Sequence, residues 1–213
     1  MMLPLGRVTS MVVIATAIAL GGARADAQTL PTSRCAGAKV RCIMGKTHVC
    51  GVAGVRGQLK CNQRASSKSS PVDPECLQLA VDKLRDCFAA AEQRNDCLTI
   101  GDANDVQNHI DDYVQNIVDT LNPDNPAPIT NLCFVGKMKA LADGTADKLA
   151  CFEDAFRAGA AADPTCLALV DAHLANTWTK LESGGDCLTM GGLDDFEAGM
   201  NAFIAATIAG LDP

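Results

Sequence analysis

The second half of this chain of 213 residues repeats the first half at an offset of ninety residues. Residues 61–123 align with residues 151–213 without a gap, and 17 of the 63 paired residues are identical. Most identities lie in two short motifs, DPxCLxL at 73–79 and DCLTxG at 96–101, each of which recurs ninety residues later. Such self-similarity indicates that one structural unit occurs twice. It therefore predicts an architecture but points to no reaction.

The N-terminal segment has the features of a secretory signal peptide. Arg7 precedes an apolar run at 12–20, and the small residues Ala25 and Ala27 follow it. This order fits a signal-peptidase site, and the run is shorter than the ~20 apolar residues of a membrane-spanning helix. We therefore expect residues 1–27 to be removed, no transmembrane segment to remain, and the mature chain to be secreted or to lie in the periplasm or cell envelope.

The charge of the chain argues against nucleic-acid binding. Eight lysines or arginines and no acidic residue lie between Arg34 and Lys68. The whole chain nevertheless has a formal charge of −7, and because residues 1–27 carry +1, the mature chain is near −8. An acidic surface repels nucleic acid. We expect the basic segment to lie beside acidic segments of its own repeat.

The pattern of apolar residues predicts an all-α fold made of two tandem three-helix repeats. The Asp-Pro pairs at 73–74 and 163–164 are typical helix starts, with aspartate as the N-cap and proline at the first helical position. Apolar residues recur at helical spacing after each pair, and again along 106–121 and its counterpart. The segments at 35–64 and 131–157 complete the two sets of three helices.

These elements divide the chain into four parts. A signal peptide at 1–27 precedes the first helical repeat at 28–121, and the second repeat occupies 131–213. Between the repeats lies a linker at 122–130, whose three prolines forbid a continuous helix.

Eleven cysteines in an exported chain indicate disulfides, and helix geometry restricts their pairing. Cys42 and Cys61 lie 19 residues apart on one predicted helix, hence ~28 Å apart, whereas a disulfide needs Cα atoms about 4.4–6.8 Å apart. Bridges must therefore run between the first and second helices of each repeat, in an antiparallel ladder. The predicted disulfides are Cys42–Cys97, Cys50–Cys87, Cys61–Cys76, Cys133–Cys187 and Cys151–Cys166, and Cys35 is left as a free thiol.

One pair of cysteines is absent from the second repeat. At the offset of ninety, Cys50 and Cys87 correspond to Ala140 and Thr177. Their joint absence predicts that they form a third rung of the ladder, which only the first repeat has.

This arrangement resembles known disulfide-linked helical hairpins, such as the CHCH family, in architecture only, because the short cysteine spacings of that family are absent. The pattern Cys…Cys-x14-Cys…Asp-Cys-Leu-Thr-x-Gly is similar to that of secreted bacterial tandem-repeat proteins of unassigned function. The second resemblance covers the whole mature chain and implies no catalytic or binding residues.

No group of residues in the sequence predicts a catalytic, cofactor or metal site. His48 and Cys50 lie near Cys42, but soft metals prefer closely spaced thiolates in a Cys-x2–4-Cys pattern, which the chain lacks. Nucleophilic catalysis needs a serine or cysteine beside a histidine that an acid orients, and no such set is evident. We therefore expect no enzymatic activity and no cofactor.

The expected function is that of a secreted, non-enzymatic binding or structural protein whose partner is a protein or an apolar small molecule. Two alternatives stay open. One is a carrier that holds a small apolar ligand between its helices. The other is an envelope metal-binding or thiol-redox protein that uses Cys35 and neighbouring thiols.

Overall fold

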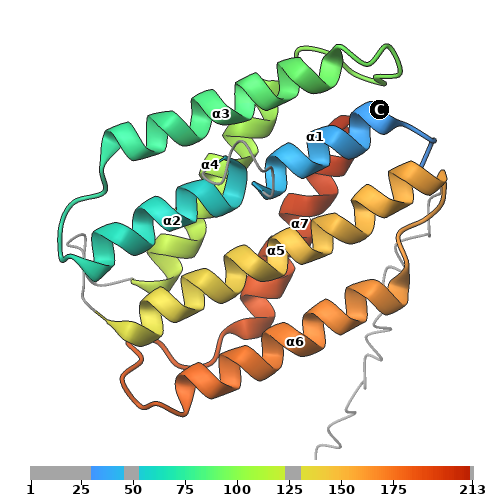
Figure 1. Ribbon diagram of the computed structural model, residues 1–213. Helices are drawn as coiled ribbons and strands as arrows, with labels where there is room; N and C mark the ends of the chain where they lie inside the picture. Colours follow the sequence, from blue (N-terminus) through green and yellow to red (C-terminus); the bar gives the residue numbers. More distant parts are fainter. Residues whose placement is uncertain (1–29, 46–52, 123–130, 212–213) are drawn as a thin grey trace, which may run out of the picture.

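The chain folds into helices over the residues that the structure describes (Figure 1). This computed structural model describes residues 30–45, 53–122 and 131–211; the predicted signal peptide at 1–27 lies outside them, as does the predicted linker except Asn122. The predicted all-α class is confirmed, because the described residues form seven helices and no strand. The helices are α1 (Arg34–Met44), α2 (Gly54–Ser67), α3 (Pro74–Glu92), α4 (Ala103–Leu121), α5 (Leu132–Ala158), α6 (Pro164–Glu182) and α7 (Leu193–Leu211).

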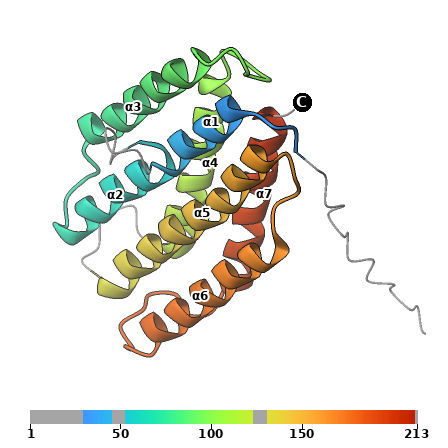
Figure 2. The ribbon, with the colours of Figure 1, turned by 45° about the vertical axis from the view of Figure 1, so that its right-hand side comes forward.

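Two layers of helices make up the molecule. In Figures 1 and 2, α3, the consecutive helices α1 and α2, α5 and α6 lie side by side in one layer, and α4 and α7 cross behind it. The amide of Ser33, before α1, donates to the carbonyl of Phe156, near the end of α5, at 3.1 Å, so these two helices run in opposite directions. None of the described helices has both the length and the apolar character of a membrane span.

Local sequence determines where several helices begin and end. The Asp-Pro pairs start α3 and α6 as predicted: the side chain of Asp73 accepts from the amide of Glu75 at 2.9 Å, and that of Asp163 accepts from the amide of Thr165 at 2.8 Å. A proline follows at the first position of each helix. α1 ends at Met44 and is capped by Gly45, whose left-handed backbone (φ 72°) favours glycine because a Cβ is disfavoured there.

The first half, residues 30–122, has two helices where the sequence predicts one. The N-cap residues Ser33 of α1 and Asn131 of α5 are 98 residues apart, whereas α3 and α6 begin 90 residues apart. Between these two points the first half therefore holds eight more residues than the second half, residues 131–211. These extra residues lie between α1 and α2, which together take the place that the continuous α5 has in the second half.

Five disulfides use ten of the eleven cysteines, and each joins a helix either to another helix or to the segment that follows one. The pairs are Cys35–Cys97, Cys42–Cys87, Cys61–Cys76, Cys133–Cys187 and Cys151–Cys166. The last three agree with the predicted ladder. The predicted pairs Cys42–Cys97 and Cys50–Cys87 are wrong, and so is the prediction that Cys35 is a free thiol. Cys50 itself lies outside the described residues.

The break between α1 and α2 explains the corrected pairing. The predicted single helix over 35–64 includes the eight extra residues in its length. Every cysteine before them is therefore assigned to the wrong level along the helix axis. In the structure Cys42 lies level with Cys87, with their Cα atoms 5.7 Å apart. At the offset of 98 the counterpart of Cys42 is Ala140. The first half therefore does have one rung more than the second half, but Cys42, and not Cys50, provides it.

Side chains from all seven helices form one hydrophobic core, which both halves share. The predicted apolar stripes of α4 and α7 are buried in this core. Where the two helices meet, the ring of Tyr113 stacks on the ring of Phe203, with centroids 4.6 Å apart and an interplanar angle of 7°. The buried hydroxyl of Tyr113 lies 2.7 Å from that of Thr145, and burial raises the pKa of Tyr113 above its ordinary value. Because Tyr113 and Phe203 are counterparts at the offset of ninety, the halves meet through matching residues.

The missing rung of the second half leaves a pocket of about 200 Å³ between α5 and α6, lined in part by Ala140 and Thr177. We expect the double variant Ala140→Cys/Thr177→Cys to form a sixth disulfide on export, because Cys42 and Cys87 do so at the corresponding place. Its free energy of unfolding should rise by about 2–4 kcal/mol. Urea unfolding with and without reductant measures this gain.

Each single variant is the control, since it adds one reactive thiol without a bridge and should give no comparable gain. Two additional free thiols in the double variant would contradict the proposed correspondence between Ala140 and Cys42.

Candidate functional site

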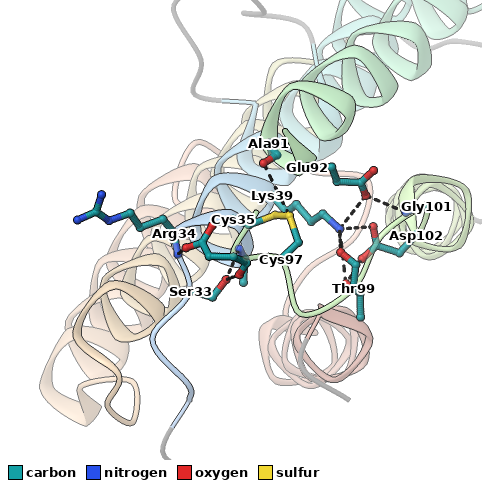
Figure 3. Close-up of a disulfide and its surroundings, with 12 residues drawn as sticks. Ser33, Arg34, Cys35, Lys39, Ala91, Glu92, Cys97, Thr99, Gly101 and Asp102 are labelled. Carbon is teal, nitrogen blue, oxygen red and sulfur yellow. Dashed lines mark hydrogen bonds and ion pairs between the residues drawn. A yellow bond between two sulfur atoms is a disulfide. The ribbon is translucent and has the colours of Figure 1, made fainter. Parts of the chain in front are cut away.

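The first disulfide of each half is accompanied by a buried lysine. Lys39 lies one helical turn after Cys35 (Figure 3), and its side chain is 1% exposed. Its ammonium donates to the carbonyl of Thr99 at 2.7 Å and pairs with Asp102 at 2.7 Å and Glu92 at 2.9 Å. The charge of the lysine is thus neutralised within the protein, and the contacts join α1 to the end of α3 and the start of α4.

The second half repeats this arrangement. Lys137, also 1% exposed, donates to Glu182 at 2.6 Å and to the carbonyl of Thr189 at 2.7 Å, and its nitrogen lies 4.4 Å from the ring centroid of Trp178. The hydrogen bond from Lys137 lowers the pKa of Glu182, and the same carboxylate oxygen accepts from the amide of Gly191. The DCLTxG motif therefore supplies a disulfide, a carbonyl and an amide that hold the chain around the lysine. The role of this motif is structural.

The cysteines do not form a metal site among the described residues. Cys133, Asp186 and Cys187 bring their potential ligand atoms within 4.8 Å of one another. The two sulfur atoms are joined in a disulfide, however, so neither is a thiolate that could bind a metal. Cys42 is likewise bonded to Cys87, and His48 lies outside the described residues.

A groove between α2, α3 and α4 is the candidate ligand site. Its volume is about 490 Å³, and it lies wholly in the first half. Its apolar lining residues are Val72, Pro74, Leu77, Val81 and Val114. Its polar lining residues are Gln58, Asn62, Gln78, Asp111 and Gln115. None of the residues that line it is basic, and Asp111 is its single carboxylate.

The amide side chains of the groove donate to other groups of the protein. Gln58 donates to Asp111 at 2.6 Å, and Asn62 donates to the carbonyl of Gln58 at 3.0 Å. Gln78 and Gln115 each donate to an aspartate one helical turn further along their own helix. Each of these bonds uses one of the two N–H groups of its amide, so every amide can still offer an oxygen and an N–H to a ligand.

Asp111 is held by two buried amides. Gln58 and Gln107, 4% and 5% exposed, both donate to its Oδ1 atom at 2.6 Å. Among the described residues, no lysine or arginine pairs with Asp111. The buried Oε1 atom of Gln107 has no hydrogen-bond partner there either. The described part of the chain thus supplies amide donors to this carboxylate but no cation.

The corresponding place in the second half contains a lysine. Lys148 is the counterpart of Gln58 and is 3% exposed. Its ammonium donates to Asn201, the counterpart of Asp111, at 2.7 Å and pairs with Asp171 at 2.5 Å. The pKa of the neighbouring Glu197 is raised, first by burial and then by the charge of Asp171. The second half therefore has a lysine ammonium beside Asn201, whereas the described part of the first half has no ammonium beside Asp111.

The chain has no match among protein-family models, curated proteins or solved structures. Its function therefore has to be inferred from the groove and from the difference between the halves.

Proposed function

We propose that this protein is a secreted, non-enzymatic binding protein that holds a small molecule in the groove between α2, α3 and α4. The observation that carries the proposal is the groove itself, whose volume of about 490 Å³ lies within the usual range of small-molecule sites. It combines apolar walls with a few oriented polar groups, as such sites commonly do. The Cys61–Cys76 disulfide joins two of its three helices and limits their separation.

The residues of the groove favour binding over catalysis. Asp111 is a lone carboxylate, and no serine, cysteine, histidine or lysine lines the groove. General acid–base and nucleophilic mechanisms require such groups in pairs. The polar half of the lining also favours a ligand with a polar group over the wholly apolar ligand of the carrier alternative.

The disulfides support an oxidising compartment outside the cytosol. Ten of the eleven cysteines are bonded in pairs, which favours a structural role for them over metal binding or thiol-redox chemistry. A signal peptide at 1–27 would direct the chain to that compartment.

The proposal is tested by a nuclear magnetic resonance titration of the ¹⁵N-labelled mature protein with a library of small molecules. We expect the bound molecules to shift the amide signals of residues 58–62, 74–81 and 111–115. Hits that shift signals elsewhere, or no hits at all, would contradict a binding role for the groove.

A variant that fills the groove provides the matched comparison. Gln58→Lys/Asn62→Phe introduces the second half's own residues, Lys148 and Phe152, into the first half. We expect it to keep its helical circular dichroism and to lose the groove's titration shifts. Gln93→Lys, on an exposed residue outside the groove, adds the same charge and should bind as the parent protein does.

A further inference from the structure

The charge of the groove restricts the chemistry of its ligand. Asp111 is the one ionisable side chain that lines it, and the amide groups of the other polar lining residues can accept as well as donate hydrogen bonds. A carboxylate or phosphate ligand would meet this negative charge without a cation to balance it. A ligand that donates hydrogen bonds and carries a positive charge would satisfy both the carboxylate and the amide oxygens.

The second half shows which group can occupy such a place. There the ammonium of Lys148 lies between Asn201 and Asp171, and its four-carbon stem is buried with it. In the first half the lysine is replaced by Gln58, and the counterpart of Asn201 is the ionisable Asp111. The counterpart of Asp171 is Val81, so the groove of the first half has its single carboxylate at Asp111 and lacks the ammonium.

We propose that the ligand of the groove is an organic ammonium, that is, a primary amine on an apolar body. The inference rests on the proposed function, because it names the ligand class of the same groove. The ammonium donates to Asp111, as that of Lys148 donates to Asn201, and its other protons reach the oxygens of the surrounding amides. The apolar body lies against Leu77, Val81 and Val114.

Isothermal titration calorimetry with three probes of similar shape tests the ligand class. The probes are 2-phenylethylammonium, 2-phenylethanol and 3-phenylpropanoate, which carry a positive, no and a negative charge. At low ionic strength we expect the ammonium to bind at least about tenfold more tightly than the alcohol, since a hydrogen bond to a charged group is the stronger kind. The carboxylate should show no binding, and added salt should weaken the binding of the ammonium.

Asp111→Asn removes the charge with little change of shape. It should weaken the binding of the ammonium by about tenfold to a hundredfold and leave that of the alcohol unchanged. Asp112→Asn is the matched control, because it removes the neighbouring charge of the same helix from a residue that does not line the groove. Gln58→Lys provides an internal ammonium and should abolish the binding of the probe even if Asp111→Asn folds poorly.

The outcomes separate this inference from the proposed function. Equal affinities for ammonium and alcohol, or an Asp111→Asn variant that binds the ammonium as before, would overturn the ammonium as the ligand while the groove remained a binding site. If no probe binds the groove and the library titration also gives no shifts there, both the inference and the proposed function are wrong.

Discussion

Replacing Lys137 by methionine lowers the free energy of unfolding by about 3 kcal/mol, the lower end of the range for removing one partner of a buried ion pair. The ammonium of Lys137 has two hydrogen-bond partners, Glu182 and the carbonyl of Thr189. Methionine fills the space but leaves the carbonyl of Thr189 without its donor and Glu182 without its cation, although Glu182 still accepts from the amide of Gly191. Glu182 is 17% exposed and can recover some hydration, which places the effect at the lower end.

Lys139→Met is the matched control for this prediction. Lys139 lies two residues further along α5, is 70% exposed and pairs with Asp143 one helical turn away. Its replacement should cost less than about 0.5 kcal/mol, as is usual for exposed pairs. Urea unfolding of the mature, oxidised protein measures both values. Equal effects of the two replacements would show that the buried lysine does not stabilise the fold.

Removal of the Cys133–Cys187 disulfide in the double variant Cys133→Ala/Cys187→Ala lowers the free energy of unfolding by about 4 kcal/mol on the loop-entropy estimate. The bridge closes a sequence separation of 54 residues and joins the start of α5 to the segment after α6. Its loss gives the unfolded chain more freedom and releases the segment that carries the partner carbonyl of Lys137.

The Cys151–Cys166 bridge provides the comparison, because it closes a separation of only 15 residues in the same half. The same loop-entropy estimate gives about 3 kcal/mol for its removal. Both double variants are compared by urea unfolding without reductant. A loss below about 1 kcal/mol for Cys133→Ala/Cys187→Ala would contradict the stabilising role of the longer bridge.

The parts of the fold that depend on local chemistry could be predicted from the sequence. The Asp-Pro pairs at 73–74 and 163–164 cap helices in the structure, because the aspartate and proline act within one helical turn. The stripe at 106–121 is buried as its spacing predicts, since an amphipathic helix turns its apolar face to the core.

The disulfide register of the first half could not be predicted in the same way, because it depends on where the eight extra residues lie. A one-residue gap aligns Cys42 with Cys133, whereas the structure places Cys35 at the position that corresponds to Cys133. Lys39 and Lys137, each four residues after its cysteine, are the signal in the sequence that favours the correct alignment. Their structural role is evident only once the fold places carboxylates beside them.

The groove could not be predicted from the sequence, because its residues come from three helices and have no characteristic spacing. Gln58 and Asp111 are 53 residues apart and meet only through the packing of α2 against α4. The available signal was the replacement of Lys148 by Gln58 between the two halves, which by itself does not distinguish a binding site from an exposed surface.

A crystal structure of the mature protein with bound 2-phenylethylammonium tests the central claim most directly, namely that an external ammonium pairs with Asp111 in the groove of the first half. We predict that its nitrogen lies within hydrogen-bond distance of the Asp111 carboxylate and that its ring contacts Val81 and Val114. A ligand bound elsewhere, or one whose ammonium points away from Asp111 into solvent, would contradict the claim.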